Sequence, residues 1–286
     1  MSRILDGKLV RDQILAELRP RIERLSRRPG LAVVLVGDDP ASGIYVRSKV
    51  KTCEDLGIYS EQITRPAGIA TADLLAIVEG LNQRPEIDGI LVQMPLPAQV
   101  DSRRVLLSVS PDKDVDGFHP LNVGNLVSGN PGLRSCTPAG IIELLKRYQI
   151  PIAGARAVVV GRSDIVGKPM ALLLLHENAT ITICHSKTTA LAEECRRADI
   201  LVAAIGKAAL IGREFLKPGG TVIDVGMNRP ATGKGLVGDV DAQAAQEIAG
   251  AYTPVPGGVG PLTIAMLMSN TLNAAELHQS AGHAVR

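Results

Sequence analysis

The chain has 286 residues, which predicts two domains, and 45% of them are hydrophobic, enough for two cores. Aromatic residues are scarce, with no Trp, two Phe and four Tyr, so the cores must consist of Val, Ile, Leu and Ala. This composition is typical of parallel strands covered by helices. A net charge of +2 and so few rings for base stacking argue against nucleic acid as a partner.

The sequence also argues against export and membrane insertion. No apolar run approaches the length needed to span a bilayer, and the first residues carry no secretion signal. We therefore expect a cytoplasmic protein that contacts no membrane. The four cysteines show no C-x-x-C spacing, which predicts reduced thiols and no metal site.

Apolar runs of strand length alternate with helical patterns along the chain. In the first half, strands are expected at residues 31–37, 58–63 and 87–93, and helices at residues 5–25, 40–56 and 71–81. In the second half, strands are expected at residues 156–161, 180–184, 200–204 and 221–226. The alternation predicts an α/β fold with parallel sheets and right-handed crossovers. A last apolar helix at residues 262–277 is expected to return to the first domain.

The helix predicted at residues 40–56 carries the first candidate for chemistry. Asp38 and Asp39 can cap it, and Gly57 suits the residue past its end. Tyr45 and Lys49 are four residues apart, so their side chains are neighbours on one face. Alone, such a pair is more often an exposed lysine beside a half-buried tyrosine.

Two further candidates follow apolar strands, at the strand ends where ligands gather in parallel sheets. Gln93 ends the strand at residues 87–93, although a glutamine there can also serve only to hold a loop. The loop at residues 111–120 has three carboxylates in five positions. Asp116 stands between Val115 and Gly117, an apolar setting in which an anion requires hydrogen-bond donors.

The second half of the chain opens with a turn typical of nucleotide sites, although a plain strand-turn-helix connection fits equally well. Gly161, Ser163 and Gly167 follow a strand and precede a helix, so backbone N–H groups can approach a phosphate. The next strand ends in His185 and Ser186, with no acid to repel a 2′-phosphate. Together with Arg162, this favours NADP over NAD.

Two later segments differ in character. Residues 254–261 contain three prolines and three glycines in an apolar context, which predicts a rigid loop against a ligand or the other domain. Asp239, Asp241 and the helix after them are expected to form surface structure.

Together these blocks resemble the bifunctional methylenetetrahydrofolate dehydrogenase/cyclohydrolase family. The resemblance covers nearly the whole chain. It rests on residues 38–42 with 45–49, 89–97, 111–120, 136–138, 161–169, 184–186 and 254–261. Any one block would be weak evidence, but several in this order are specific.

The resemblance implies a homodimer of two-domain subunits with folate in the cleft between domains. Residues 1–139 and 262–286 would form the folate-binding catalytic domain, and residues 140–261 a Rossmann-type NADP-binding domain. Such enzymes oxidise 5,10-methylenetetrahydrofolate to the methenyl compound with NADP, then hydrolyse that cation to 10-formyltetrahydrofolate. Tetrahydrofolate derivatives would be the substrates.

The resemblance also implies roles for individual residues. Tyr45 would stack on the folate rings, Asp116 would bind the pterin N–H groups, Lys49 would transfer protons at the one-carbon bridge, and Gln93 would hold Lys49. The other substrate-binding residues would be Val92, Met94, Pro254, Val255, Pro256, Gly257, Gly258, Val259, Gly260 and Pro261. The cofactor-binding residues would be Gly161, Arg162, Ser163, Val166, Gly167, His185, Ser186 and Met227.

Two rival interpretations remain. A monofunctional dehydrogenase of the same fold would keep the nucleotide site and lose hydrolysis, although Lys49, Gln93 and Asp116 together count against it. A nucleotide-sensing module would bind a dinucleotide without turnover and without folate.

Overall fold

The chain divides into two units. The structure, a computed structural model, describes residues 2–37, 40–230 and 235–284, apart from the side chains of residues 40–42, 44, 45 and 281–284. Unit 1 comprises Met1–Gln13 and Thr137–Ala265, and unit 2 comprises Ile14–Cys136 and Met266–Arg286. Asp38 and Asp39, which we expected to cap a helix, lie outside the described residues.

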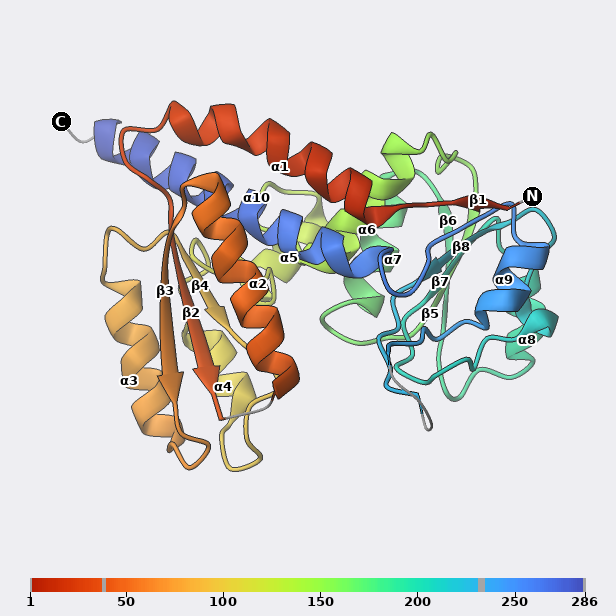
Figure 1. Cartoon of the computed structure of the whole chain (residues 1–286), viewed down its shortest axis with the longest axis horizontal. Coiled ribbons are helices and arrows are strands. Elements are labelled where there is room, and N and C mark those ends of the chain that lie inside the picture. The colour runs from red at the N-terminus through yellow and green to blue at the C-terminus, as the bar shows by residue number, and fades with distance from the viewer. Residues whose placement is uncertain (1, 38–39, 231–234, 285–286) are drawn as a thin grey trace. The chain divides into compact units, whose positions relative to one another are not determined.

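Unit 2 contains a three-stranded parallel sheet in the order β3-β2-β4 (Figure 1). Its strands are β2 (Gly30–Val36), β3 (Tyr59–Arg65) and β4 (Gly89–Val92). All seven residues of the central strand β2 are buried, which explains why it reads as one apolar run.

Unit 2 also contains the helices α2 (Pro40–Leu56), α3 (Thr71–Asn82), α4 (Ser102–Ser108) and α5 (Pro120–Ser128). α2 packs on β2 and β3, and α3 packs on β4 and α4. α2 has the predicted bounds.

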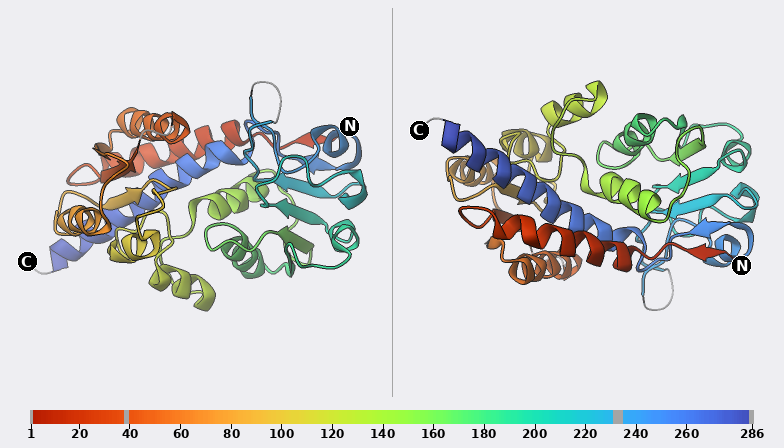
Figure 2. Two further views of the ribbon diagram at one scale, coloured as in Figure 1. Left: turned by 90° about the horizontal axis from the view of Figure 1, so that it is seen from below. Right: turned by 90° about the horizontal axis from the view of Figure 1, so that it is seen from above.

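Two long helices take part in both units. They are α1 (Gly7–Glu23) and α10 (Val259–Ala284). Within unit 2 they run side by side (Figure 2), where the Arg21 guanidinium donates to Glu276 Oε2 at 2.7 Å and to Asn273 Oδ1 at 2.8 Å.

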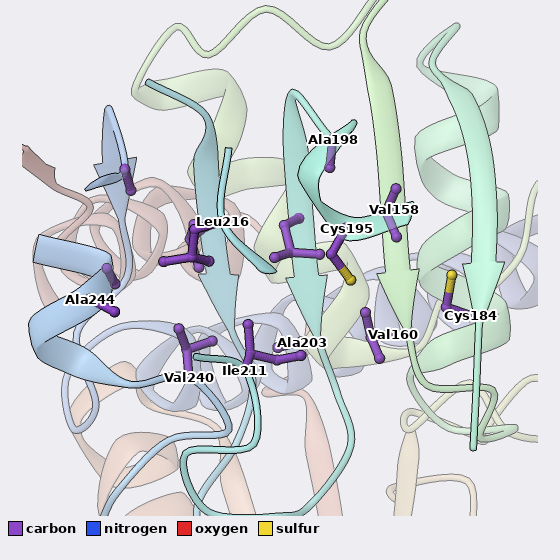
Figure 3. Close-up of a cluster of buried hydrophobic side chains, with 14 residues drawn as sticks. Val158, Val160, Cys184, Cys195, Ala198, Ala203, Ile211, Leu216, Val240 and Ala244 are labelled. Carbon is purple, nitrogen blue, oxygen red and sulfur yellow. The ribbon is translucent and has the colours of Figure 1, made fainter. Parts of the chain in front are cut away.

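Unit 1 contains a six-stranded parallel sheet in the order β1-β9-β8-β7-β5-β6. Its strands are β1 (Arg3–Ile4), β5 (Arg156–Val160), β6 (Thr180–Cys184), β7 (Ile200–Ala203), β8 (Thr221–Asp224) and β9 (Ala251–Tyr252). Its helices are α6 (Cys136–Arg147), α7 (Gly167–His176), α8 (Leu191–Arg196), the 3-10 helix η1 (Arg213–Phe215) and α9 (Ala242–Ile248). Small aliphatic side chains from β5, β7 and β8 pack with Cys184 and Cys195 in one core (Figure 3).

The two units do not follow the expected domain boundaries at residues 1–13, 137–139 and 262–265. We expected residues 1–139 to form one domain, but residues 1–13 belong to unit 1. The reason is that β1 pairs with β9: the Arg3 N–H donates to the Gly250 carbonyl and the Leu5 N–H to the Tyr252 carbonyl, both at 2.8 Å. The functional assignment of the domains stays a prediction.

A fully buried aspartate holds together distant segments of unit 2. Asp88, which precedes β4, accepts two 2.6 Å hydrogen bonds from the Arg27 guanidinium and one of 2.9 Å from the Gly30 N–H. Its Oδ1 lies 2.9 Å from Nδ1 of His278 on α10. Burial alone would raise the pKa of Asp88, but these bonds outweigh it and lower the pKa, while Asp88 raises the pKa of His278.

We expect Asp88→Ala to lower the free energy of unfolding by roughly 2–4 kcal/mol, because it leaves buried donors without an acceptor. Urea unfolding at pH 7 measures this loss. The difference from wild type should shrink as the pH falls through the lowered pKa of Asp88, since protonation removes the same charge. Asp12→Ala is the control, because Asp12 is exposed and pairs with half-buried Arg11. Equal unfolding midpoints for Asp88→Ala and wild type would contradict the assignment.

Candidate active site

The structure brings Lys49 and Gln93 together. Lys49 lies on α2 with only 9% of its surface exposed, and its Nζ donates to Gln93 Oε1 at 3.0 Å. The Gln93 N–H donates to the Val34 carbonyl at 2.9 Å, and its Nε2 donates to the Met94 carbonyl at 2.8 Å. The Gln93 amide is therefore oriented with its oxygen toward the amine.

Tyr45 lies on α2, one helical turn before Lys49. Its side chain is outside the described residues, so its predicted position beside Lys49 stays a prediction. Val92 is the last residue of β4 and is buried.

Asp116 lies in the loop between α4 and α5 and is half-buried. Removal from water raises its pKa to about 7; the charge of Lys49 opposes this rise and that of Asp114 adds to it. No residue that the structure describes donates a hydrogen bond to its carboxylate. The group is therefore available to a ligand with N–H donors.

The neighbours of Asp116 have structural partners instead. Asp114 is buried and accepts 2.8 Å hydrogen bonds from the His119 N–H and from Asn122 Nδ2. The Lys113 ammonium is also buried and donates at 2.8 Å to the carbonyls of Asn82, the last residue of α3, and Arg84. These contacts fix the loop on both sides of Asp116.

Sequence reasoning missed Asn270, a buried polar residue on α10. Its Nδ2 donates at 2.8 Å to the carbonyls of Val115 and Arg134, and Cys136 Sγ donates to the Val115 carbonyl at 3.3 Å. The one available signal was an asparagine within the predominantly apolar stretch of α10. These bonds hold the backbone directly before Asp116.

The predicted nucleotide turn follows β5 in unit 1. Gly161 has φ = +135°, and a Cβ there would lie 2.2 Å from the Ala204 carbonyl oxygen. A Cβ on Gly167 would lie 2.3 Å from the Gly161 oxygen. Only glycine permits both approaches. The Ser163 hydroxyl accepts from the N–H groups of Val166 and Gly167 at 3.2 Å each, at the start of α7.

Arg162 and Ser186 follow neighbouring strands at equivalent positions. Val160 and Cys184 are paired in the β5–β6 register. Arg162 lies two residues after Val160, and Ser186 lies two residues after Cys184. Both side chains are exposed. The Lys187 N–H donates to His185 Nδ1 at 3.1 Å, which orients the imidazole.

The glycine-proline loop packs against the start of α1, which belongs to the same unit. Its expected contact with a ligand or the other domain stays a prediction. The Gly7 N–H donates to the Gly257 carbonyl at 3.0 Å, and the Gly258 N–H donates to the Pro254 carbonyl at 2.8 Å. Met227 is 47% exposed, and its Sδ would lie 3.4 Å from a Cβ on Gly260.

The described residues contain no group of His, Cys, Asp and Glu side chains that could hold a metal ion. Within the same part of the chain, every helix is too short or too polar to cross a bilayer. The cysteines are all free and buried.

Comparison with known proteins identifies the family. Residues 5–116 match the model of the tetrahydrofolate dehydrogenase/cyclohydrolase catalytic domain, and residues 135–279 match that of the tetrahydrofolate dehydrogenase/cyclohydrolase NAD(P)-binding domain. The chain is 65% identical to the bifunctional protein FolD of Solibacter usitatus, over 96% of this chain and 98% of that one.

Solved structures agree. The bifunctional FolD methylenetetrahydrofolate dehydrogenase/cyclohydrolase of Campylobacter jejuni is 44% identical with a TM-score of 0.94, over 97% of this chain and 99% of that one. The Trypanosoma brucei FolD enzyme, solved with NADP cofactor and inhibitor, is 37% identical with a TM-score of 0.91, over 96% and 98%. This chain therefore belongs to the tetrahydrofolate dehydrogenase/cyclohydrolase family.

Proposed function

We infer that this enzyme oxidises 5,10-methylenetetrahydrofolate to 5,10-methenyltetrahydrofolate with NADP and hydrolyses the product to 10-formyltetrahydrofolate. The observation that carries the assignment of both activities is the 3.0 Å contact between Lys49 and Gln93. A dehydrogenase alone has no need of a positioned amine, whereas hydrolysis requires proton transfer as water attacks the cation. The relatives named as bifunctional support the same conclusion.

In this proposal Lys49 transfers the proton, and Gln93 orients the Lys49 amine. The Gln93 oxygen accepts one N–H of the amine, and the bond from Gln93 to the Met94 carbonyl stops the amide from turning. Asp116 accepts hydrogen bonds from the pterin N–H groups, and Tyr45 stacks on the folate ring. Val92, Met94 and residues 254–261 stay predicted as substrate-binding residues.

The residues at the turn after β5 fit a dinucleotide. When bound, NADP supplies a hydride acceptor for the oxidation. Gly161 and Gly167 lie so close to neighbouring backbone atoms that neither position has room for a side chain. The backbone at this turn is the part that would face a phosphate. The Ser163 hydroxyl accepts from the backbone, so its own hydrogen remains able to donate. His185, Val166 and Met227 are proposed to contact the rest of the cofactor.

Arg162 and Ser186 are proposed to hold the 2′-phosphate. Arg162→Ala should raise the KM for NADP roughly 10- to 100-fold, because a charge-assisted bond is lost, and should leave the KM for NAD unchanged. Initial rates with each nucleotide measure the effect. Arg197→Ala, which removes an exposed arginine from the end of α8, is the control. Equal losses for NADP and NAD would mean that Arg162 does not recognise the phosphate.

One experiment tests the two activities together. Purified protein is mixed with 5,10-methylenetetrahydrofolate and NADP, then with NAD, and reduced nicotinamide is followed together with the methenyl compound. Reduction with NADP, and loss of added methenyl compound faster than without enzyme, are expected. Reduction with hydrolysis at the control rate would favour the monofunctional dehydrogenase, and no reduction with either nucleotide would favour the sensing module.

Two further properties implied by the family are proposed with it. They are a homodimer, which light scattering of the purified protein would test, and a cytoplasmic location, which fractionation of cells would test.

A further inference from the structure

Asp239 is fully buried, although the sequence placed it in surface structure. Its carboxylate accepts hydrogen bonds from three successive backbone N–H groups, at 2.6 Å from Ile205, 2.9 Å from Gly206 and 3.0 Å from Lys207. Asn228 Nδ2 donates to the same carboxylate at 2.9 Å. One side chain thus fixes the loop after β7 and the loop after β8.

A second buried aspartate holds Asp239 in place. Asp224, the last residue of β8, accepts from the Asp239 N–H at 2.8 Å and from the Val240 N–H at 3.0 Å. The approach requires glycine on each side, because a Cβ on Gly238 would lie 1.7 Å from Asp224 Oδ2 and one on Gly226 would lie 2.4 Å from Asp239 Oδ1. The sequence therefore commits two aspartates and two glycines to this one arrangement.

The loop that Asp239 holds adjoins the nucleotide turn. Ala204 directly precedes the three donors, and its carbonyl oxygen would contact a Cβ on Gly161. β5 and β7 are neighbours, and the chain moves to opposite sides of β5 to form β6 and β7. This is the point of an open parallel sheet at which nucleotides bind.

We propose that Asp239 is a positioning residue for NADP, which sets the backbone of residues 205–207 and Met227–Asn228 at the cofactor edge of unit 1. The inference rests on the proposed function and adds a residue that touches neither substrate nor cofactor. The carboxylate accepts four donors, whereas a carboxamide presents its own N–H₂ group to some of them. Loss of the carboxylate should therefore move these loops without changing the residues proposed to contact the nucleotide.

Asp239→Asn is the test, with both activities measured on the full-length protein. We expect the KM for NADP to rise at least tenfold, while hydrolysis of methenyltetrahydrofolate without nicotinamide stays within twofold of wild type. Asp241→Asn is the matched control, because exposed Asp241 only caps α9 through the Ala244 N–H. It changes charge equally and should leave the KM unchanged.

A KM for NADP within twofold of wild type, or an equal loss of both activities, would overturn the inference. If Asp239→Asn does not fold, Asn228→Ala decides, because it removes one of the four donors and should raise the KM for NADP severalfold. An unchanged KM in that variant would then overturn the inference. Wild-type protein without any NADP-dependent reduction would instead refute the proposed function.

Discussion

Lys49→Met should slow the hydrolysis of methenyltetrahydrofolate by roughly 10²- to 10⁴-fold, the range expected when a positioned proton-transfer group is lost. Methionine is unbranched and keeps most of the apolar stem of lysine, so the packing of α2 should survive. NADP binding should be unchanged, because Lys49 belongs to unit 2 and the predicted nucleotide turn to unit 1. Hydride transfer should suffer less than hydrolysis, since it depends chiefly on positioning.

Hydrolysis is followed by the loss of methenyl compound against a no-enzyme control, and NADP binding by titration. Lys51→Met is the matched control: Lys51 lies on the same helix and is exposed, and the substitution is chemically identical. Full hydrolase activity in Lys49→Met would refute the role assigned to the amine. An equal loss of hydrolase activity in Lys51→Met would mean that the substitutions act by disturbing α2.

The sequence predicted the strands best where burial is complete. The run that became β2 is apolar throughout because both faces of a central parallel strand are covered, and the same holds for β7 and β8. The helix at residues 40–56 was predictable because Pro40 suits its first turn and Gly57, with φ = +76°, follows its last residue. β1 could not be predicted, since two exposed residues acquire their conformation only by pairing with β9.

The site was less accessible from the sequence. The types of Lys49, Gln93 and Asp116 indicate chemistry, but the hydrogen bond between Lys49 and Gln93 joins residues 44 positions apart. It depends on how α2 packs on β2, the strand that pairs with β4. Asp239 was misassigned to the surface because an aspartate after glycine usually indicates an exposed turn. Its burial depends on backbone donors from three other positions in the chain, which no local pattern reveals.

Asp116→Asn should weaken folate binding and stabilise the free protein at the same time. The carboxamide replaces one acceptor by a donor facing the pterin N–H groups, so the KM for folate should rise roughly 10- to 100-fold. Folding raises the pKa of Asp116 to about 7. The protonated carboxyl group therefore contributes stability that is fully present below the unfolded pKa and is lost as the pH rises through 7. Asp116→Asn removes the cost of holding a charged carboxylate in this half-buried position.

We therefore expect Asp116→Asn to raise the free energy of unfolding at pH 8 by roughly 1–2 kcal/mol, a modest gain because the half-buried carboxylate still reaches water. The gain should vanish below about pH 4, where the wild-type carboxyl group is neutral in both states.

Substrate affinity of the wild type should fall by up to about tenfold for each pH unit below 7, because folate binds the ionised form. Urea unfolding and KM measurements across this range test both effects, with Asp73→Asn at the exposed start of α3 as control. A variant that loses folate affinity without gaining stability at pH 8 would show that Asp116 is already ionised at neutral pH, and the pH dependence of substrate binding would then have to arise elsewhere.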